Sequence, residues 1–237
     1  MTREFALPAA LARAVADRRG AWHFIEGFAA AWDVAREPGH GVPEAELRAA
    51  EARLGLRLPP ALREAYLLIG RHAGLTGNHD RLLAPAEWYV EDGALVIRTE
   101  NQGAASWGTP LADAAREDPP LRVRPDLADK AAEEWQPWLD PLSLAFVELV
   151  LSESLHAGRG LTDFLEQDEG TLPLLRAHAT RLPFPDYPHG GLTRWYLAGD
   201  VVLRDDGGAA LLARARTPEA LRAFRALVPG DWLEDSC

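Results

Sequence analysis

Residues 46–66, ELRAAEARLGLRLPPALREAY, predict two helices separated by a short extended turn. The first helix has one apolar face, made by Leu47, Ala50 and Leu54. Gly55 then supplies a C-terminal cap, because glycine readily adopts the left-handed backbone that often ends a helix. Pro59 and Pro60 keep the chain extended and open the second helix. That helix ends at Gly70 and carries apolar residues at helical spacing, Leu62, Tyr66 and Ile69.

The segment before this pair, residues 1–42, predicts further helices. Pro8 suits a helix start and Gly20 a helix end. The next helix shows apolar residues at spacings of three and four, namely Trp22, Ile25, Ala29 and Trp32. We therefore expect residues 1–42 to form an N-terminal helical extension.

The middle of the chain changes to a strand pattern. Residues 88–90 and 94–99 flank Asp92-Gly93, and this dipeptide between apolar runs predicts a tight hairpin with positive φ at Gly93. Residues 106–107 and 121–124 predict two more short strands. Helices followed by hairpin-linked strands indicate the α+β class, with a central antiparallel sheet flanked by helices.

A very apolar helix is predicted after Asp140-Pro141. Only a narrow polar stripe around Glu148 and Ser152 interrupts it, and such a helix is buried on most sides. We expect it to form the centre of the core. The residues expected to be largely buried are Leu54, Leu58, Leu62, Trp107 and Phe146.

The last part of the chain predicts a strand–helix extension over residues 171–237. Residues 195–197, 201–203 and 209–215 read as strands separated by turns, and a last helix begins at Thr217-Pro218. The proline-rich stretch 182–191 is the best candidate for a linker. We expect a single domain over residues 1–237, with a core at about 43–170.

Composition limits the classes of partner. The chain has 237 residues and a formal net charge of -11, which repels nucleic acid and anionic membranes and would attract a basic protein. The simpler interpretation of this charge is that it keeps the protein in solution. The single cysteine, Cys237, cannot form a disulfide within the chain. This usage, together with the lack of an apolar leader or membrane span, predicts a cytoplasmic protein.

The sequence contains none of the catalytic motifs that a single chain can reveal. It has no G-x-S-x-G elbow, no H-E-x-x-H pair, no Walker loop and no dinucleotide-binding fingerprint. The loop from Arg71 to Asp80 is the best catalytic candidate, since His72, His79 and Asp80 could bind a metal or transfer protons. Their spacing matches no known ligand set, and Gly74, Gly77 and Asn78 indicate an ordinary turn-rich loop. We therefore predict no catalytic residue, no metal and no cofactor.

Acidic residues gather around the predicted strands and their loops. A solvated surface is the simplest interpretation, and a surface that attracts a basic protein is the functional one. The strand aromatics nearby could serve as interface anchors, although core packing is the more common role of aromatic residues on strands. The predicted partner-binding residues are Glu91, Asp92, Glu100 and Asp118.

The stretch 46–66 resembles the opening of the SUKH superfamily, the Smi/Knr-like proteins. The shared features are an acidic-apolar helix, the Leu54-Gly55 to Leu58-Pro59 turn, and a second helix with an apolar end at 67–69 before glycine. The hairpin, the segments 82–85, 100–103 and 107–108, and the late apolar helix are also similar. The resemblance covers roughly residues 43–155.

This resemblance implies helices packed on an antiparallel sheet and a function by binding. Many bacterial members are immunity proteins that neutralise toxins, often nucleases, and the family has no catalytic residues to carry over. We therefore expect a cytoplasmic immunity protein that binds a basic toxin domain. Two alternatives stay open: a regulatory or scaffolding protein of the same fold, and an enzyme that uses the loop from Arg71 to Asp80.

Overall fold

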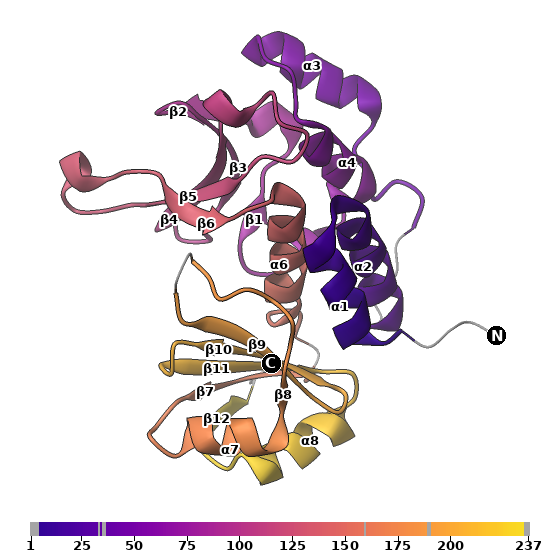
Figure 1. The fold of residues 1–237 in the computed structure, drawn as a ribbon, viewed down its shortest axis with the longest axis vertical. Coiled ribbons are helices and arrows are strands. Elements are labelled where there is room, and N and C mark those ends of the chain that lie inside the picture. Colours follow the sequence, from indigo (N-terminus) through magenta and orange to yellow (C-terminus); the bar gives the residue numbers. More distant parts are fainter. Residues whose placement is uncertain (1–4, 33, 35–36, 159, 189–190, 235–237) are drawn as a thin grey trace.

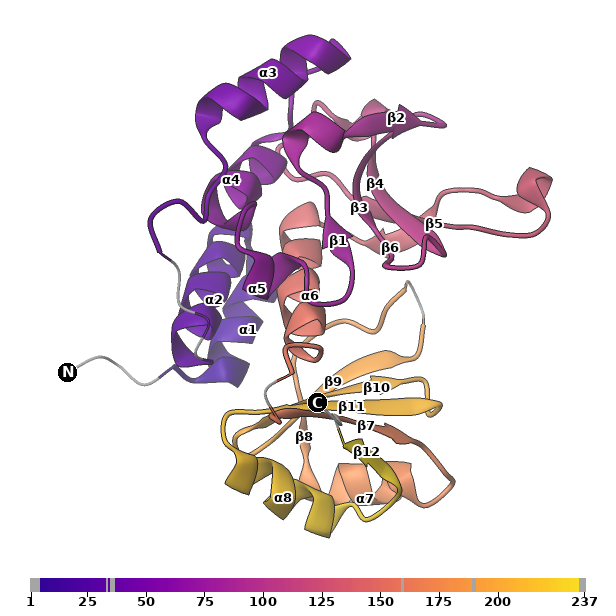
Figure 2. The same cartoon turned by 180° about the vertical axis from the view of Figure 1, so that it is seen from behind.

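The computed structural model describes residues 5–32, 34, 37–158, 160–188 and 191–234. Cys237, the predicted lone thiol, lies outside these residues. The described chain forms two six-stranded antiparallel sheets together with eight α-helices, which confirms the α+β class. Figures 1 and 2 show two lobes, one holding each sheet, with helix α6 pointing from the first lobe toward the second.

The first lobe begins with helices. They are α1 (Leu7–Ala16), α2 (Arg18–Ala31), α3 (Glu44–Leu54), α4 (Pro60–Ile69) and the short α5 (Ala73–Thr76). The two helices predicted from residues 46–66 are confirmed as α3 and α4, and Gly55 caps α3 in the left-handed region with φ of 67°. Leu58 and Leu62 are buried as predicted, but Leu54 lies at the end of α3 and is only half-buried.

The first sheet is an antiparallel array in the order β1-β3-β4-β5-β6, and β2 pairs with the other end of β3. The strands are β1 (Arg81–Leu82), β2 (Tyr89–Glu91), β3 (Ala94–Thr99), β4 (Ala105–Pro110), β5 (Leu121–Pro125) and β6 (Gln136–Leu139). Short 3-10 turns lie between them, η1 (Pro85–Glu87), η2 (Leu111–Asp113) and η3 (Lys130–Ala132). Trp107 on β4 is buried, as predicted.

The predicted hairpin is confirmed. β2 and β3 pair antiparallel with Glu91 opposite Ala94, and the two residues between them have positive φ, 43° at Asp92 and 75° at Gly93. No atom outside the turn lies within 4 Å of the position that a Cβ on Gly93 would take. Backbone conformation alone therefore requires glycine here.

We expect Gly93→Ala to lower the free energy of unfolding by about 1 kcal/mol, because a Cβ disfavours the left-handed region. Gly93→Asn should cost less, since asparagine tolerates this conformation. Urea unfolding of the parent and the two variants measures the difference. Equal stability of the alanine and asparagine variants would show that this turn does not hold its left-handed geometry in solution.

Helix α6 (Leu142–Ser154) is buried along its whole length, which confirms the predicted centre of the core. It packs against α2, α4 and α5 on one side and against β6 on another. Asp118 secures its beginning, because its carboxylate accepts hydrogen bonds from the amide (2.9 Å) and the hydroxyl (2.7 Å) of Ser143. Because every residue of α6 is buried, its few polar side chains lie in the interior of the protein.

The second sheet has the order β12-β7-β11-β10-β9-β8, again antiparallel throughout. Its strands are β7 (Thr162–Glu166), β8 (Thr180–Arg181), β9 (Thr193–Ala198), β10 (Val201–Asp206), β11 (Ala210–Ala215) and β12 (Trp232–Glu234). Helices α7 (Thr171–His178) and α8 (Pro218–Leu227) cover the face turned away from the first lobe (Figure 1). The expected C-terminal extension is thus a complete sheet that also takes in β7, which lies inside the predicted core at 43–170.

The prediction of a linker at 182–191 is wrong for the residues that the structure describes there. Leu182, Phe184 and Tyr187 are buried in the same apolar cluster as α6. The apolar side chains between the prolines pack this segment into the core beside the first lobe. No helix within the described ranges is both long and apolar enough to cross a membrane.

Candidate functional site

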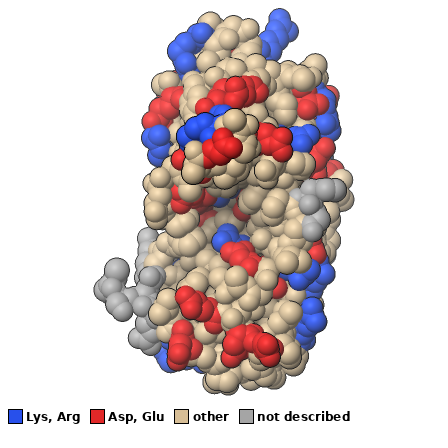
Figure 3. Space-filling model, turned by 90° about the vertical axis from the view of Figure 1, so that its left-hand side faces the viewer, with Lys and Arg blue, Asp and Glu red and all other residues tan. Residues whose placement is uncertain are grey.

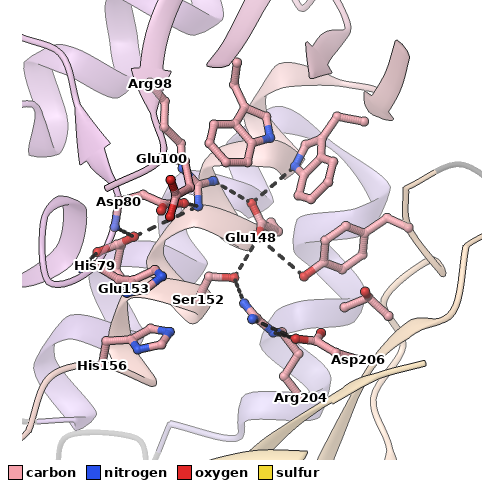
Figure 4. Close-up of a pocket in the computed structure, with 14 residues that line it drawn as sticks. His79, Asp80, Arg98, Glu100, Glu148, Ser152, Glu153, His156, Arg204 and Asp206 are labelled. Carbon is pink, nitrogen blue, oxygen red and sulfur yellow. Dashed lines mark hydrogen bonds and ion pairs between the residues drawn. The ribbon is translucent and has the colours of Figure 1, made fainter. Parts of the chain in front are cut away.

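A polar pocket of about 240 Å³ lies where the C-terminal half of α6 meets both sheets. Figure 4 shows the charged side chains that converge on it, and Figure 3 shows the molecule hollowed between its two lobes. Helix α6 contributes Glu148, Ser152 and Glu153, which are the polar interruptions in an otherwise apolar helix. The pocket is therefore built on the most deeply buried element of the fold.

Arg98 of β3 is the central cation of this pocket and is only 4% exposed. Its guanidinium donates to Asp80 at 2.5 Å and to Glu148 at 3.0 Å, and it lies 4.3 Å from the ring centre of Trp107. Burial lowers the pKa of Arg98, but the attraction of Glu148, Asp80 and Glu153 outweighs burial and raises it. Arg98 therefore stays charged and holds several buried carboxylates in place.

Glu153 fixes the backbone of the loop before β1. Its carboxylate accepts hydrogen bonds from the amides of Asn78 (2.6 Å), His79 (2.7 Å) and Asp80 (3.1 Å). Burial raises the pKa of Glu153, against the opposing effect of these amides and of Arg98. This clamp places the side chains of His79 and Asp80 at the pocket.

The second lobe enters the same network through β10. Arg204 donates to the hydroxyl of Ser152 at 2.9 Å and pairs with Asp206, also at 2.9 Å. The hydroxyl of Ser152 in turn donates to Glu148 at 2.6 Å. Charged groups from both sheets thus meet on one face of α6, and the pocket depends on the packing of both lobes.

His79, Asp80 and Glu100 form a group in which one potential ligand atom of each residue lies within 4.8 Å of the others. Glu100 is held by hydrogen bonds from the amides of Gln102 (2.7 Å) and Ala104 (3.0 Å), and these bonds keep its pKa below the usual range. The ring of His79 stacks on His156 with centroids 4.0 Å apart. An imidazole and two carboxylates are thus gathered at one side of the pocket (Figure 4).

The loop from Arg71 to Asp80 does not act as one constellation. His72 lines a different region, where its ring nitrogen lies 2.9 Å from the carbonyl oxygen of Val34 and its ring packs on His40. His79 and Asp80 line the pocket, and His72 does not. Two of the three candidates from the sequence, His79 and Asp80, therefore lie together at the pocket. Glu100, rather than His72, is the third residue of their group.

The four predicted partner-binding residues lie in three different places of the first lobe. Glu91 and Asp92 lie at the β2–β3 turn, where Arg124 pairs with both at 2.7 and 2.9 Å. Glu100 lies at the other end of β3, beside the pocket, and Asp118 holds the start of α6. Only Glu91 and Asp92 remain together.

β2 also exposes two large apolar side chains beside these two acids. Tyr89 and Val90 are 39% and 44% exposed, although most large apolar side chains of the described chain are buried. β2 pairs with β3 and with no other described strand, so no described strand covers its other side. An open strand edge with exposed apolar side chains is a surface to which another chain can add.

Sequence reasoning missed Arg98, Glu153 and Arg204. The signals were present: Arg98 interrupts the apolar strand ALVIRT, and Glu148 and Glu153 interrupt an apolar helix. A charge within a buried run is expected to have a partner, because an unpaired buried charge is costly. The identity of each partner depends on the packing of segments that are distant in the sequence.

The fold and the site define an α+β protein with two antiparallel sheets that meet at a buried, mostly apolar helix carrying a few charged side chains. Comparison of the chain with family models, with curated proteins and with solved structures finds no match. Membership of the SUKH superfamily therefore stays a prediction from the residues between about 43 and 155.

Proposed function

We propose that this protein acts by binding another protein, and that its partner is a basic toxin domain that it neutralises in the cytoplasm. The observation that supports this best is the side of β2 that no described strand covers. There the exposed side chains of Tyr89 and Val90 adjoin the acidic turn at Glu91 and Asp92. The resemblance to SUKH immunity proteins supplies the class of partner.

The chemistry of this edge suits a protein ligand. A strand side without a neighbouring strand can pair with an added strand, and tyrosine is a frequent anchor of protein interfaces. Apolar exposure provides affinity that is independent of salt, while the acids beside it provide orientation. The β2 edge, meaning Tyr89, Val90, Glu91 and Asp92, is thus the proposed binding surface.

Charge complements the apolar edge. The net charge of -11 attracts a basic partner over a distance, and acids at the interface raise the rate of association. In Figure 3 acidic and basic groups alternate over the side of the molecule shown. Local charge at the turn, rather than a uniformly acidic face, is therefore expected to orient the partner.

The experiment measures association kinetics with the partner that a pull-down and mass spectrometry identify. Glu91→Gln/Asp92→Asn should slow association severalfold at low salt, and high salt should reduce this difference. These changes keep the turn intact, because asparagine tolerates the positive φ at position 92. The matched control is Glu169→Gln/Asp231→Asn, which removes two charges from exposed positions outside the β2 edge.

Equal association rates for these two double variants would show that the turn does not orient the partner. Separately, Tyr89→Ser should weaken binding by more than about 2 kcal/mol, a factor of about 30 in Kd, if Tyr89 is an anchor. Leu227→Ser on α8 is its control, since Leu227 is also exposed. Unchanged affinity in Tyr89→Ser would exclude the β2 edge as the binding surface.

A further inference from the structure

The pairing of β1 with β3 places two chemically important segments opposite each other. Arg81 pairs with Thr99 and Leu82 with Arg98 in antiparallel register. Asp80 comes just before β1 and Glu100 just after β3, so the register brings these two carboxylates side by side. His79 adjoins Asp80, and one potential ligand atom of each of the three residues lies within 4.8 Å of the others.

One carboxylate oxygen of Asp80 is left without a hydrogen-bond donor among the residues that the structure describes. The residue is 6% exposed, and its Oδ2 atom pairs with Arg98. Its Oδ1 atom is buried and accepts no hydrogen bond from any described residue. A buried carboxylate oxygen without a donor is costly, and a cation is the ligand that satisfies it best.

The charges around Asp80 also favour a bound cation. Asp80, Glu148 and Glu153 are buried around Arg98, and Glu100 lies beside them. When all are ionised, four carboxylates face one guanidinium, since the charges of Arg204 and Asp206 offset each other. Buried charges are normally paired or bind metal ions, so the site has room for added positive charge.

From this geometry we propose that His79, Asp80 and Glu100 bind one divalent transition-metal ion. One imidazole nitrogen and two carboxylate oxygens are a donor set that suits zinc, manganese and related ions. Calcium and magnesium prefer oxygen donors alone and should bind more weakly. The site lies at a pocket of about 240 Å³, which leaves space for water or a further ligand on the metal.

The three ligands are held in place before any ion arrives. Glu153 fixes the backbone of residues 78–80 through three amide hydrogen bonds. Two amides of the β3–β4 turn orient Glu100. The amide nitrogen of Asn101 lies 3.1 Å from Nδ1 of His79. With this amide turned over, its oxygen accepts the Nδ1–H and leaves Nε2 to the metal, which is how a neighbouring group orients a ligating histidine.

The test titrates metal-depleted protein with Zn²⁺, Mn²⁺ or Ca²⁺ by calorimetry. We expect one Zn²⁺ or Mn²⁺ per chain, weaker binding of Ca²⁺, and a higher melting temperature with the transition metal. Co²⁺ gives an independent readout, because a bound imidazole changes its visible absorption spectrum. Neither readout requires the protein partner, so failure here leaves the proposed function standing, and failure of the β2 edge leaves the metal site standing.

Ligand variants locate the ion. His79→Gln and Glu100→Gln should each weaken Zn²⁺ binding at least tenfold, and Asn101→Ala by about tenfold. The matched control is His178→Gln, which changes another exposed histidine and should not alter binding. Binding that survives both His79→Gln and Glu100→Gln, or that is equally strong for Ca²⁺ and Zn²⁺, would overturn the proposal.

Discussion

Replacing Arg98 with methionine is expected to lower the free energy of unfolding by about 3–5 kcal/mol. Arg98 is buried and pairs with Asp80 and Glu148, while Glu153 lies 4.0 Å away. Methionine keeps much of the side-chain volume but leaves these carboxylates buried without their cation. Urea unfolding of the parent and the variant at neutral pH measures the loss.

Two further variants separate charge from packing. Arg48→Met changes an exposed arginine and should stay within about 0.5 kcal/mol of the parent. Arg98→Met/Glu148→Gln removes one of the stranded carboxylates and should recover at least about 1 kcal/mol, because neighbouring charges are coupled. A loss below about 1 kcal/mol in Arg98→Met, or no recovery in the double variant, would contradict the buried network.

Replacing Phe146 with alanine is expected to lower the free energy of unfolding by about 3–5 kcal/mol. Phe146 is buried on α6, and its ring makes edge contacts with Tyr66 of α4 and Trp22 of α2 at centroid distances of 6.1 and 6.3 Å. Removing the ring leaves a cavity between three helices, which cannot close without moving α6.

Denaturant unfolding of Phe146→Ala tests this arrangement, with Leu67→Ala as its control. Leu67 lies on α4 but is 39% exposed, so its truncation should cost far less. A loss below about 1 kcal/mol in Phe146→Ala would mean that α6 is not the centre of the core. A loss equal to that of Leu67→Ala would contradict the burial of Phe146.

The sequence allowed prediction of the local elements because their signals are local. Capping by Gly55, the turn at Asp92-Gly93 and the apolar helix after Pro141 each depend on a few adjacent residues, and the structure confirms all three. The division into two sheets could not be predicted, because strand pairing joins distant segments. β7, for example, pairs with β11 and β12 rather than with the strands that precede it.

The linker prediction shows the limit of composition as a guide. Proline-rich composition favours a linker, but the side chains of Phe184 and Tyr187 are buried in the core. Burial of single aromatic side chains within an irregular stretch has no periodic signal. Only the three-dimensional surface of the first lobe determines where they dock.

The site was predictable in part. His79 and Asp80 were candidates from the sequence, and both lie at the pocket, while His72 lies elsewhere. Glu100 was assigned to an acidic surface, because the sequence alone does not show that pairing of β1 with β3 brings Glu100 beside Asp80. Given the register of β1 and β3, we assign Glu100 to the proposed metal site and no longer to the proposed interface.

Photo-crosslinking in the native cells tests the central claim, binding of a protein at the β2 edge, most directly. A photoreactive amino acid is placed at Val90 on β2 or at Leu227 on α8, two positions that are both 44% exposed. We predict one defined adduct with a basic protein at position 90 and no such adduct at position 227. The same adducts at both positions, or none at position 90, would contradict the claim.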